Sequence, residues 1–160
     1  MPSPGRVINW WPVSLLTAAA ALMPAQAPAQ EPSLEPMLRL DTGMHTAKIF
    51  RAATDAAGRV LATASYDKTV RLWSLETGEL IRVLRPPIGV GHEGELNAVA
   101  MSPDGRLAAT GGYTGYETYS IYVFEAASGR LIRRVGGLPS SIDHLAWSPD
   151  GGFVVAALWG

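Results

Sequence analysis

The chain has 160 residues, a formal net charge of −1 at pH 7 and no cysteine, and these values already exclude several functions. Without cysteine it has no disulfide, no thiolate metal site and no cysteine nucleophile. Thirteen basic residues against fourteen acidic ones create no field that attracts nucleic acid or an anionic membrane, so we expect neither as a partner. The length suffices for one domain or for part of a larger one.

The first thirty residues have the composition of an export signal. Arg6 is the only charged residue among them, and an apolar run follows over residues 10–23. Small residues then stand at alternate positions, namely Ala25, Ala27 and Ala29. We therefore expect residues 1–29 to be a signal peptide and the protein to be periplasmic or extracellular. The apolar run is shorter than the roughly 20 residues that span a bilayer, so we expect no membrane insertion after signal removal.

After a polar, proline-bearing linker at residues 30–36, the chain repeats itself. The sequence Ser-Pro-Asp-Gly occurs at residues 102–105 and again at residues 148–151. A related sequence, Asp-Ala-Ala-Gly, stands at residues 55–58, at a similar distance before the first copy. A period of about 46 residues is close to the roughly 40–45 of a propeller blade. Each unit holds short β-rich runs separated by turn residues. This pattern predicts an all-β fold of four-stranded antiparallel meanders.

Three stretches of the first unit carry a family likeness. Residues 43–45, 63–67 and 70–74 read Gly-Met-His, Thr-Ala-Ser-Tyr-Asp and Val-Arg-Leu-Trp-Ser. They resemble a blade of the WD-repeat (WD-40) β-propeller family, of the exported bacterial type, although Ser74 stands where the family has Asp. The resemblance implies a hydrogen-bonded chain of four side chains inside the blade, formed by His45, Thr63, Asp67 and Trp73.

The same resemblance, extended over residues 37–160, weakens along the chain. The second unit keeps His92 and Thr110 as a partial hydrogen-bonded chain, but Phe124 replaces Trp and the turn contains no Asp. The likeness places the blades at about residues 43–84 and 91–136, with a truncated third blade at about 137–160 and a possible ring-closing strand at 37–41. Two and a half blades do not close a ring of 4–8. We therefore expect an incomplete ring, an N-terminal fragment whose partners include the remaining blades of a longer chain.

We expect no catalytic residue, no metal and no cofactor within these residues. His45 and His92 occupy equivalent repeat positions, which favours a structural role. His144 has no counterpart in the other units and lies on an expected innermost strand, residues 142–147, from which it could line the channel. It lacks the spacing of a zinc site. Ser148 and Asp150 lie close to it in sequence, but they belong to the recurring turn rather than to a nucleophilic triad.

The second unit carries two elaborations, at residues 85–95 and 111–120. Connections in a meander alternate between two rims, so both loops lie on the same rim. Insertions collected on one face of a repeat array indicate its binding face. The candidate partner-binding residues are Tyr113, Tyr116, Glu117, Tyr119 and His144. The alternative is that the tyrosines only pack the loop against neighbouring blades.

These observations predict a non-catalytic, exported WD-repeat scaffold that binds a protein or peptide. Two alternatives stay open. The chain is an accessory propeller of a larger exported hydrolase, such as a caspase-like peptidase, or it is a component of a periplasmic envelope complex. The spacing of Asp67 and Trp73 favours the WD-repeat branch over translocation-type propellers, which also use Ser-Pro-Asp-Gly turns.

Overall fold

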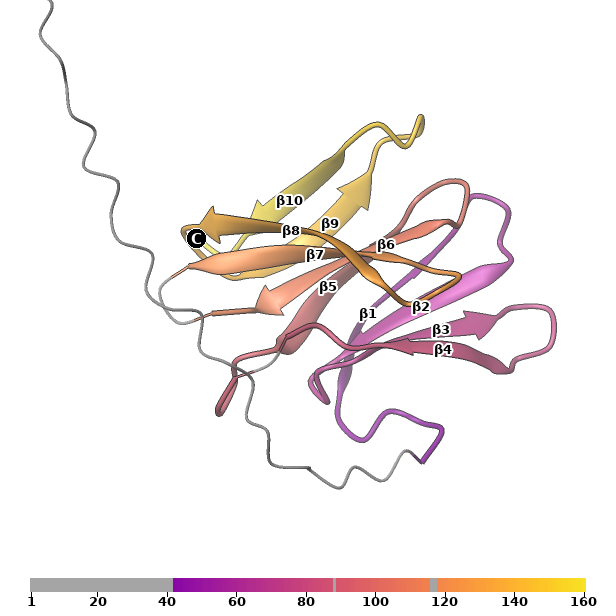
Figure 1. The fold of residues 1–160 in the computed structure, drawn as a ribbon, viewed down its shortest axis with the longest axis horizontal. Coiled ribbons are helices and arrows are strands. Elements are labelled where there is room, and N and C mark those ends of the chain that lie inside the picture. Colours follow the sequence, from indigo (N-terminus) through magenta and orange to yellow (C-terminus); the bar gives the residue numbers. More distant parts are fainter. Residues whose placement is uncertain (1–41, 88, 116–117) are drawn as a thin grey trace, which may run out of the picture. The chain divides into compact units, whose positions relative to one another are not determined.

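The computed structural model describes residues 42–87, 89–115 and 118–160 (Figure 1). The predicted signal peptide (1–29), linker (30–36) and ring-closing strand (37–41) lie outside the described residues, as do Tyr116 and Glu117. The secondary structure of the described part consists of β-strands and turns. Within this part there is no helix long and hydrophobic enough to cross a bilayer.

The first repeat unit folds into a four-stranded antiparallel sheet whose strands follow chain order. The strands are β1 (Ile49–Thr54), β2 (Val60–Ser65), β3 (Val70–Ser74) and β4 (Leu80–Leu84). Valine, threonine and isoleucine recur in them, and these β-branched residues suit a pleated, half-buried surface. The predicted meander is confirmed for this unit.

The second unit repeats this arrangement (Figure 1). Its strands are β5 (Glu95–Met101), β6 (Leu107–Tyr113), β7 (Tyr119–Glu125) and β8 (Leu131–Leu138). Because β8 continues to Leu138, this sheet ends beyond the predicted limit at residue 136. A third, two-stranded antiparallel sheet follows, formed by β9 (Ile142–Trp147) and β10 (Val154–Leu158).

The recurring Ser-Pro-Asp-Gly motif forms the turn between the first and second strands of a unit. Ser102 Oγ donates to Asp104 Oδ1 at 2.6 Å and accepts from the backbone N–H of Leu107 at 2.9 Å. Gly105 has a φ of +74°, a conformation that glycine adopts without steric cost. Ser148 makes the same pair of bonds in the third unit. The two turns therefore share their hydrogen bonds as well as their sequence.

The hydrophobic core lies between neighbouring sheets. Tyr122 and Phe124 of β7 belong to one buried cluster with Leu72 of β3 and Leu84 of β4. A second cluster joins the second and third sheets through Ala98, Ala100, Ala109, Ile121, Val123, Ile142 and Leu145. Full burial of one large apolar side chain contributes about 1.5–3 kcal/mol, so each sheet depends on its neighbour for its stability.

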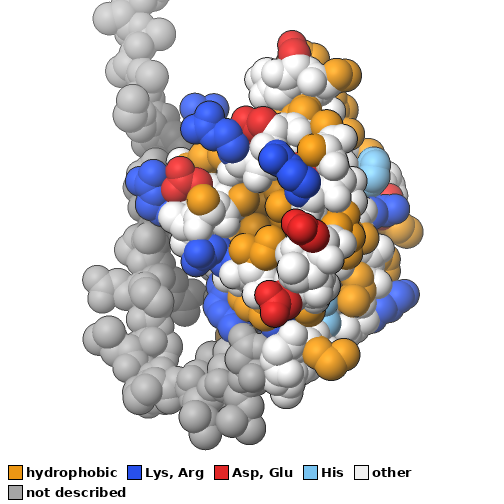
Figure 2. Space-filling view, turned by 90° about the vertical axis from the view of Figure 1, so that its right-hand side faces the viewer, with side chains coloured by type: hydrophobic (Ala, Val, Ile, Leu, Met, Phe, Trp, Pro, Cys, Tyr) orange, Lys and Arg blue, Asp and Glu red, His pale blue; other side chains and the backbone are white. Residues whose placement is uncertain are grey.

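The first strands of the three units lie next to one another. Arg51 Nη2 of β1 donates to the backbone oxygen of Asp143 in β9 at 3.4 Å, and Trp147 Nε1 donates to the backbone oxygen of Ala100 in β5 at 3.2 Å. On the face shown in Figure 2, basic, acidic and hydrophobic side chains are interspersed. This mixture agrees with the nearly balanced net charge of the chain.

Candidate functional site

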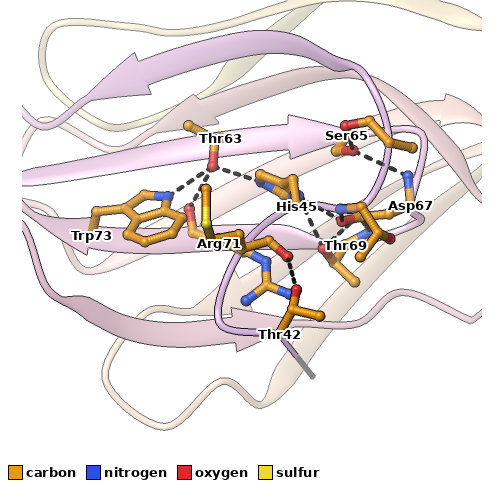
Figure 3. Close-up of polar contacts among 11 residues, drawn as sticks. Thr42, His45, Thr63, Ser65, Asp67, Thr69, Arg71 and Trp73 are labelled. Carbon is orange, nitrogen blue, oxygen red and sulfur yellow. Dashed lines mark hydrogen bonds and ion pairs between the residues drawn. The ribbon is translucent and has the colours of Figure 1, made fainter. Parts of the chain in front are cut away.

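Four side chains of the first repeat unit form a continuous hydrogen-bonded chain (Figure 3). Trp73 Nε1 donates to Thr63 Oγ1 at 2.9 Å, and His45 Nε2 lies 2.8 Å from the same hydroxyl. His45 Nδ1 lies 2.8 Å from Asp67 Oδ2. A carboxylate only accepts, so Nδ1 carries a proton, and in the neutral imidazole Nε2 then accepts from the Thr63 hydroxyl. The structure thus brings together the four residues that the family resemblance joins.

The turn between β2 and β3 fixes the acidic end of this chain. Asp67 Oδ1 accepts from the hydroxyl of Thr69 at 2.6 Å and from its backbone N–H at 3.0 Å. Asp67 Oδ2 accepts from the backbone N–H of Thr46 at 3.1 Å as well as from His45. Lys68, with a φ of +67°, is the one non-glycine residue of the described part in the left-handed region. This conformation reverses the chain directly after Asp67.

The order carboxylate, imidazole, hydroxyl is also the order of a nucleophilic triad, but the surroundings here differ. Thr63 is buried on a central strand, and its oxygen already accepts from Trp73. A nucleophile needs access to substrate and an oxyanion-stabilising group beside it. The arrangement therefore satisfies buried polar groups and holds the loop before β1 against β2 and β3.

Hydrogen bonding also sets the charge of Asp67. Burial alone would raise the pKa of this carboxyl, but hydrogen bonds from Thr69, His45 and the Thr46 backbone outweigh burial and lower the pKa. A carboxyl whose pKa is lower in the folded state stabilises the fold above its unfolded pKa of about 4. That contribution is lost as the pH falls through the folded pKa.

We expect the free energy of unfolding to decrease as the pH falls below about 4, and to decrease less steeply in Asp67→Asn. The asparagine side chain does not titrate in this range, although the variant has a lower free energy of unfolding at neutral pH. Urea unfolding at several pH values measures both slopes. The buried Asp55, whose pKa is also lowered by backbone hydrogen bonds that outweigh burial, keeps part of the slope in the variant. Equal slopes in the two proteins would contradict the assignment to Asp67.

The partial chain expected in the second unit does not form. The His92 side chain is 85% exposed and pairs with Glu95 Oε1 at 2.8 Å, whereas Thr110 is buried and donates to the backbone oxygen of Ala98 at 2.8 Å. Phe124 offers Thr110 no donor, and Thr114 occupies the turn position of Asp67. The second unit has no carboxylate in this turn and no indole on its third strand. His92 therefore lacks the hydrogen-bond partners that hold His45 inside the first unit.

In their described parts the two elaborated loops lie on one rim, where the first loop is bonded to the β2–β3 turn and the second loop to the first. Lys68 Nζ donates to the backbone oxygens of Gly89 at 3.1 Å and Gly91 at 2.6 Å. The backbone N–H of Gly94 donates to the oxygen of Tyr113 at 2.5 Å, which joins the first loop to the start of the second. The loop rim, as we call residues 85–87, 89–94, 113–115 and 118–119, is therefore held by hydrogen bonds.

The structure separates the predicted partner-binding residues. Tyr113 is 38% exposed on the loop rim, while Tyr119 packs against the second hydrophobic cluster. Tyr119 therefore agrees in part with the alternative that the tyrosines pack the loop against neighbouring blades. His144 is exposed on the first strand of the third unit, opposite Ala157. Among the residues that the structure describes, no group of three or more His, Asp or Glu side chains is arranged to hold a metal ion.

An aromatic pair beside the loop rim escaped the sequence-based prediction. The rings of Phe50 and Tyr66 stack with centroids 4.7 Å apart and planes 20° apart, and Lys48 Nζ lies 4.3 Å above the Phe50 ring. Phe50 is the extra residue of a β-bulge in β1, and Asn97 and Asp143 hold the same place in β5 and β9. Bulges re-aim side chains. Steps of 47 and 46 residues relate these positions, but their bulge geometry is not visible in the sequence.

Comparison with protein families agrees with this fold and geometry. The model of the family described as WD40, "WD domain, G-beta repeat", matches residues 40–74 and 78–116. These two stretches of the chain are thus similar to WD40 repeats. The WD40 repeats of the RRP9 crystal structure superpose with a TM-score of 0.60 at 22% identity, over 71% of this chain and 33% of that chain. This likeness supports the propeller fold.

Curated relatives with similar WD40 sequences are much longer than the matched region. Mouse (Mus musculus) coronin-7 is 34% identical over 116 residues, which is 71% of this chain and 12% of that protein. The small ribosomal subunit protein RACK1y of rice (Oryza sativa subsp. japonica) is 31% identical over 97 residues, which is 61% of this chain and 26% of that protein. The guanine nucleotide-binding protein subunit beta of tobacco (Nicotiana tabacum) is 29% identical over 106 residues, with 64% and 27% covered. The chain thus spans about an eighth to a quarter of these relatives.

Proposed function

We propose that the protein is a non-catalytic WD40 scaffold that binds a protein or peptide on its loop rim. The observation that carries the proposal is the tethering of that rim. Lys68 binds two carbonyl oxygens of the first loop, and Gly94 binds Tyr113 of the second. Fixed loops lose little conformational entropy on binding, which favours affinity.

The side chains on this rim suit a polypeptide partner. Tyr113 offers an exposed ring with a polar tip, and the stacked Phe50 and Tyr66 lie beside it. Burial raises the pKa of Tyr66, and the nearby Glu95 and Tyr113 raise it further, so its hydroxyl stays neutral and can donate. Aromatic residues with polar ends are enriched among the energetically important residues of protein interfaces.

We expect the double variant Tyr113→Ala, Tyr116→Ala to weaken partner capture by about tenfold while leaving the melting temperature unchanged. The matched control is Leu75→Ala, which removes an exposed apolar side chain from the β3–β4 turn on the opposite rim. Chemical crosslinking of the immobilised chain in an envelope extract, followed by quantitative mass spectrometry, measures capture. Loss of capture in Leu75→Ala with retention in the tyrosine variant would move the binding face to the other rim.

The proposal also includes export and further blades. Residues 1–29 support export through their single charge, apolar run and alternate small residues. Fractionation of expressing cells, with N-terminal sequencing of the exported form, tests this part: cleavage after Ala29 is expected, and a chain that stays cytoplasmic and uncleaved contradicts it. Further blades are supported by exposed apolar side chains on the second and third sheets, such as Val135 and Val155.

A further inference from the structure

Glu95 is the first residue of β5, beside the loop rim, and its carboxylate has little contact with solvent. The side chain is 16% exposed. Among the described residues its one side-chain partner is His92, whose Nδ1 lies 2.8 Å from Oε1. The His92 side chain is 85% exposed and has no second hydrogen bond in the described part. Burial of a carboxylate is costly unless a partner compensates. Glu95 is therefore a largely buried acceptor whose present partner can return to solvent.

Tyr113 lies directly opposite Glu95 on the neighbouring strand, β6. Residues that face each other across antiparallel strands place their side chains on the same face of the sheet. Gly112 keeps the two strands close, because an added Cβ would collide with the backbone oxygen of Glu95. Tyr113 is 38% exposed and stacks on no other aromatic ring of the described residues. Its ring is thus available to a guest beside the carboxylate.

Tyr66 brings a second aromatic ring to this place from the β2–β3 turn. The ring is supported by its stacking on Phe50, and Lys68 bonds the turn to the loop that precedes β5. Burial raises the pKa of the Tyr66 hydroxyl, and the proximity of Glu95 and Tyr113 raises it further. The Glu95 site, as we call Tyr66, Glu95 and Tyr113, therefore combines one carboxylate with two phenol rings.

The neighbouring charges leave the Glu95 site open to a cation. No lysine or arginine of the described residues forms an ion pair with Glu95. Lys68 Nζ is instead bonded to two carbonyl oxygens of the first loop, and Lys48 Nζ lies 4.3 Å from the centre of the Phe50 ring. Glu93 adds a second carboxylate two residues before Glu95. The carboxylate of Glu95 thus has no cationic partner of its own apart from the exposed His92.

We propose that the Glu95 site receives an arginine side chain of the partner, which takes the place of His92 on the carboxylate. The inference rests on the proposed function, because it names the chemistry of one residue of a peptide bound at the loop rim. A guanidinium is planar, pairs with a carboxylate through two parallel N–H···O bonds and stacks on aromatic rings. An ammonium group is compact and more strongly hydrated, so lysine fits the site less well. An acidic side chain is repelled by Glu95.

The test titrates the isotope-labelled 160-residue chain with a short peptide of glycine and serine that carries one central arginine. NMR shifts of the Gly94 and Tyr113 amides report binding. We expect saturable shifts with the arginine peptide and binding about threefold weaker with lysine in its place. With citrulline, which keeps the shape and loses the charge, binding should be about tenfold weaker. Equal binding of the citrulline or lysine peptide, or no saturable shift with arginine, would overturn the proposal.

Two variants test the carboxylate itself. Glu95→Gln keeps the size of the side chain and should weaken binding of the arginine peptide by about tenfold. The matched control is Glu79→Gln, which removes an exposed carboxylate directly before β4 on the opposite rim and should leave binding unchanged. Circular dichroism checks that both variants fold. Equal weakening in the two variants would assign the effect to net charge and would contradict the site.

The displacement of the histidine has its own variant. His92→Ala removes only the group that competes for the carboxylate, so it should bind the arginine peptide at least as tightly as the unsubstituted chain does. Weaker binding would show that the histidine stays in the site, against the proposed exchange of partners.

Partner capture distinguishes this inference from the proposed function. Capture that is lost in the double tyrosine variant but kept in Glu95→Gln would retain the loop rim as the binding face and reject the arginine. Capture that depends on neither would reject the proposed function, and the peptide titration would still decide whether the Glu95 site binds arginine.

Discussion

Replacing Thr63 with valine is expected to lower the free energy of unfolding by about 2 kcal/mol, although the two side chains have nearly the same shape. The hydroxyl accepts from Trp73 Nε1 and, with His45 neutral, donates to His45 Nε2. Without it, a donor and an acceptor lose their partner inside a buried site. Leaving a buried polar group unsatisfied costs about 1–3 kcal/mol, which exceeds the small gain from an added methyl group. Urea unfolding followed by tryptophan fluorescence measures the change.

Thr63→Ser is the control, because serine keeps the hydroxyl and loses only a methyl group. We expect it to cost about 1 kcal/mol or less. A cycle with Trp73→Phe tests the mechanism further, since phenylalanine is the residue that the second unit has at this position. If the two groups act through their hydrogen bond, the double variant should be less destabilised than the sum of the single variants. Strictly additive effects would show that Thr63 and Trp73 do not depend on each other.

Leu84→Ala is expected to cost about 3 kcal/mol, whereas Val135→Ala, at the equivalent position of the next sheet, should cost less than about 1 kcal/mol. Leu84 is fully buried in a cluster with Tyr122 and Phe124, so truncation leaves a cavity. Val135 lines a solvent-open groove on the flank of the second sheet, where solvent fills the space that truncation creates. Denaturant midpoints of the two variants, with their m-values, measure the difference.

The two variants distinguish the effect of a residue's position in the repeat from the effect of its burial by a neighbouring sheet. Both residues lie on the fourth strand of their sheets and have the same cross-strand partner position. A large cost at both positions would mean that Val135 is already covered in solution.

The strands and turns were predictable from the sequence because their causes are local. Ser102 and Ser148 stand at the start of a turn whose hydrogen bonds depend on residues at most five positions away. Glycine after Asp permits the positive φ that the reversal needs. The chain of His45, Thr63, Asp67 and Trp73 followed from resemblance to a family, since its members are distant in sequence. No local rule joins them.

The sequence-based prediction differs from the structure where tertiary contacts determine the surroundings of a side chain. His92 stands at the repeat position of His45, yet it lies in solvent because Thr114 and Phe124 supply neither the carboxylate nor the indole that hold His45. The stacking of Phe50 on Tyr66 depends on a bulge that forms only when β1 pairs with β2. Tyr119, predicted to face a partner, packs against the cluster between the second and third sheets.

By itself, the sequence determined the length of the repeat, the turn chemistry, the near-neutral charge and the absence of cysteine chemistry from these residues. These properties follow from residue identity and from spacing along the chain. Only the tertiary structure decided which equivalent positions have equivalent surroundings. Burial depends on what the neighbouring sheet places against a residue, so Leu84 and Val135 occupy one position of the repeat and differ from full burial to 43% exposure.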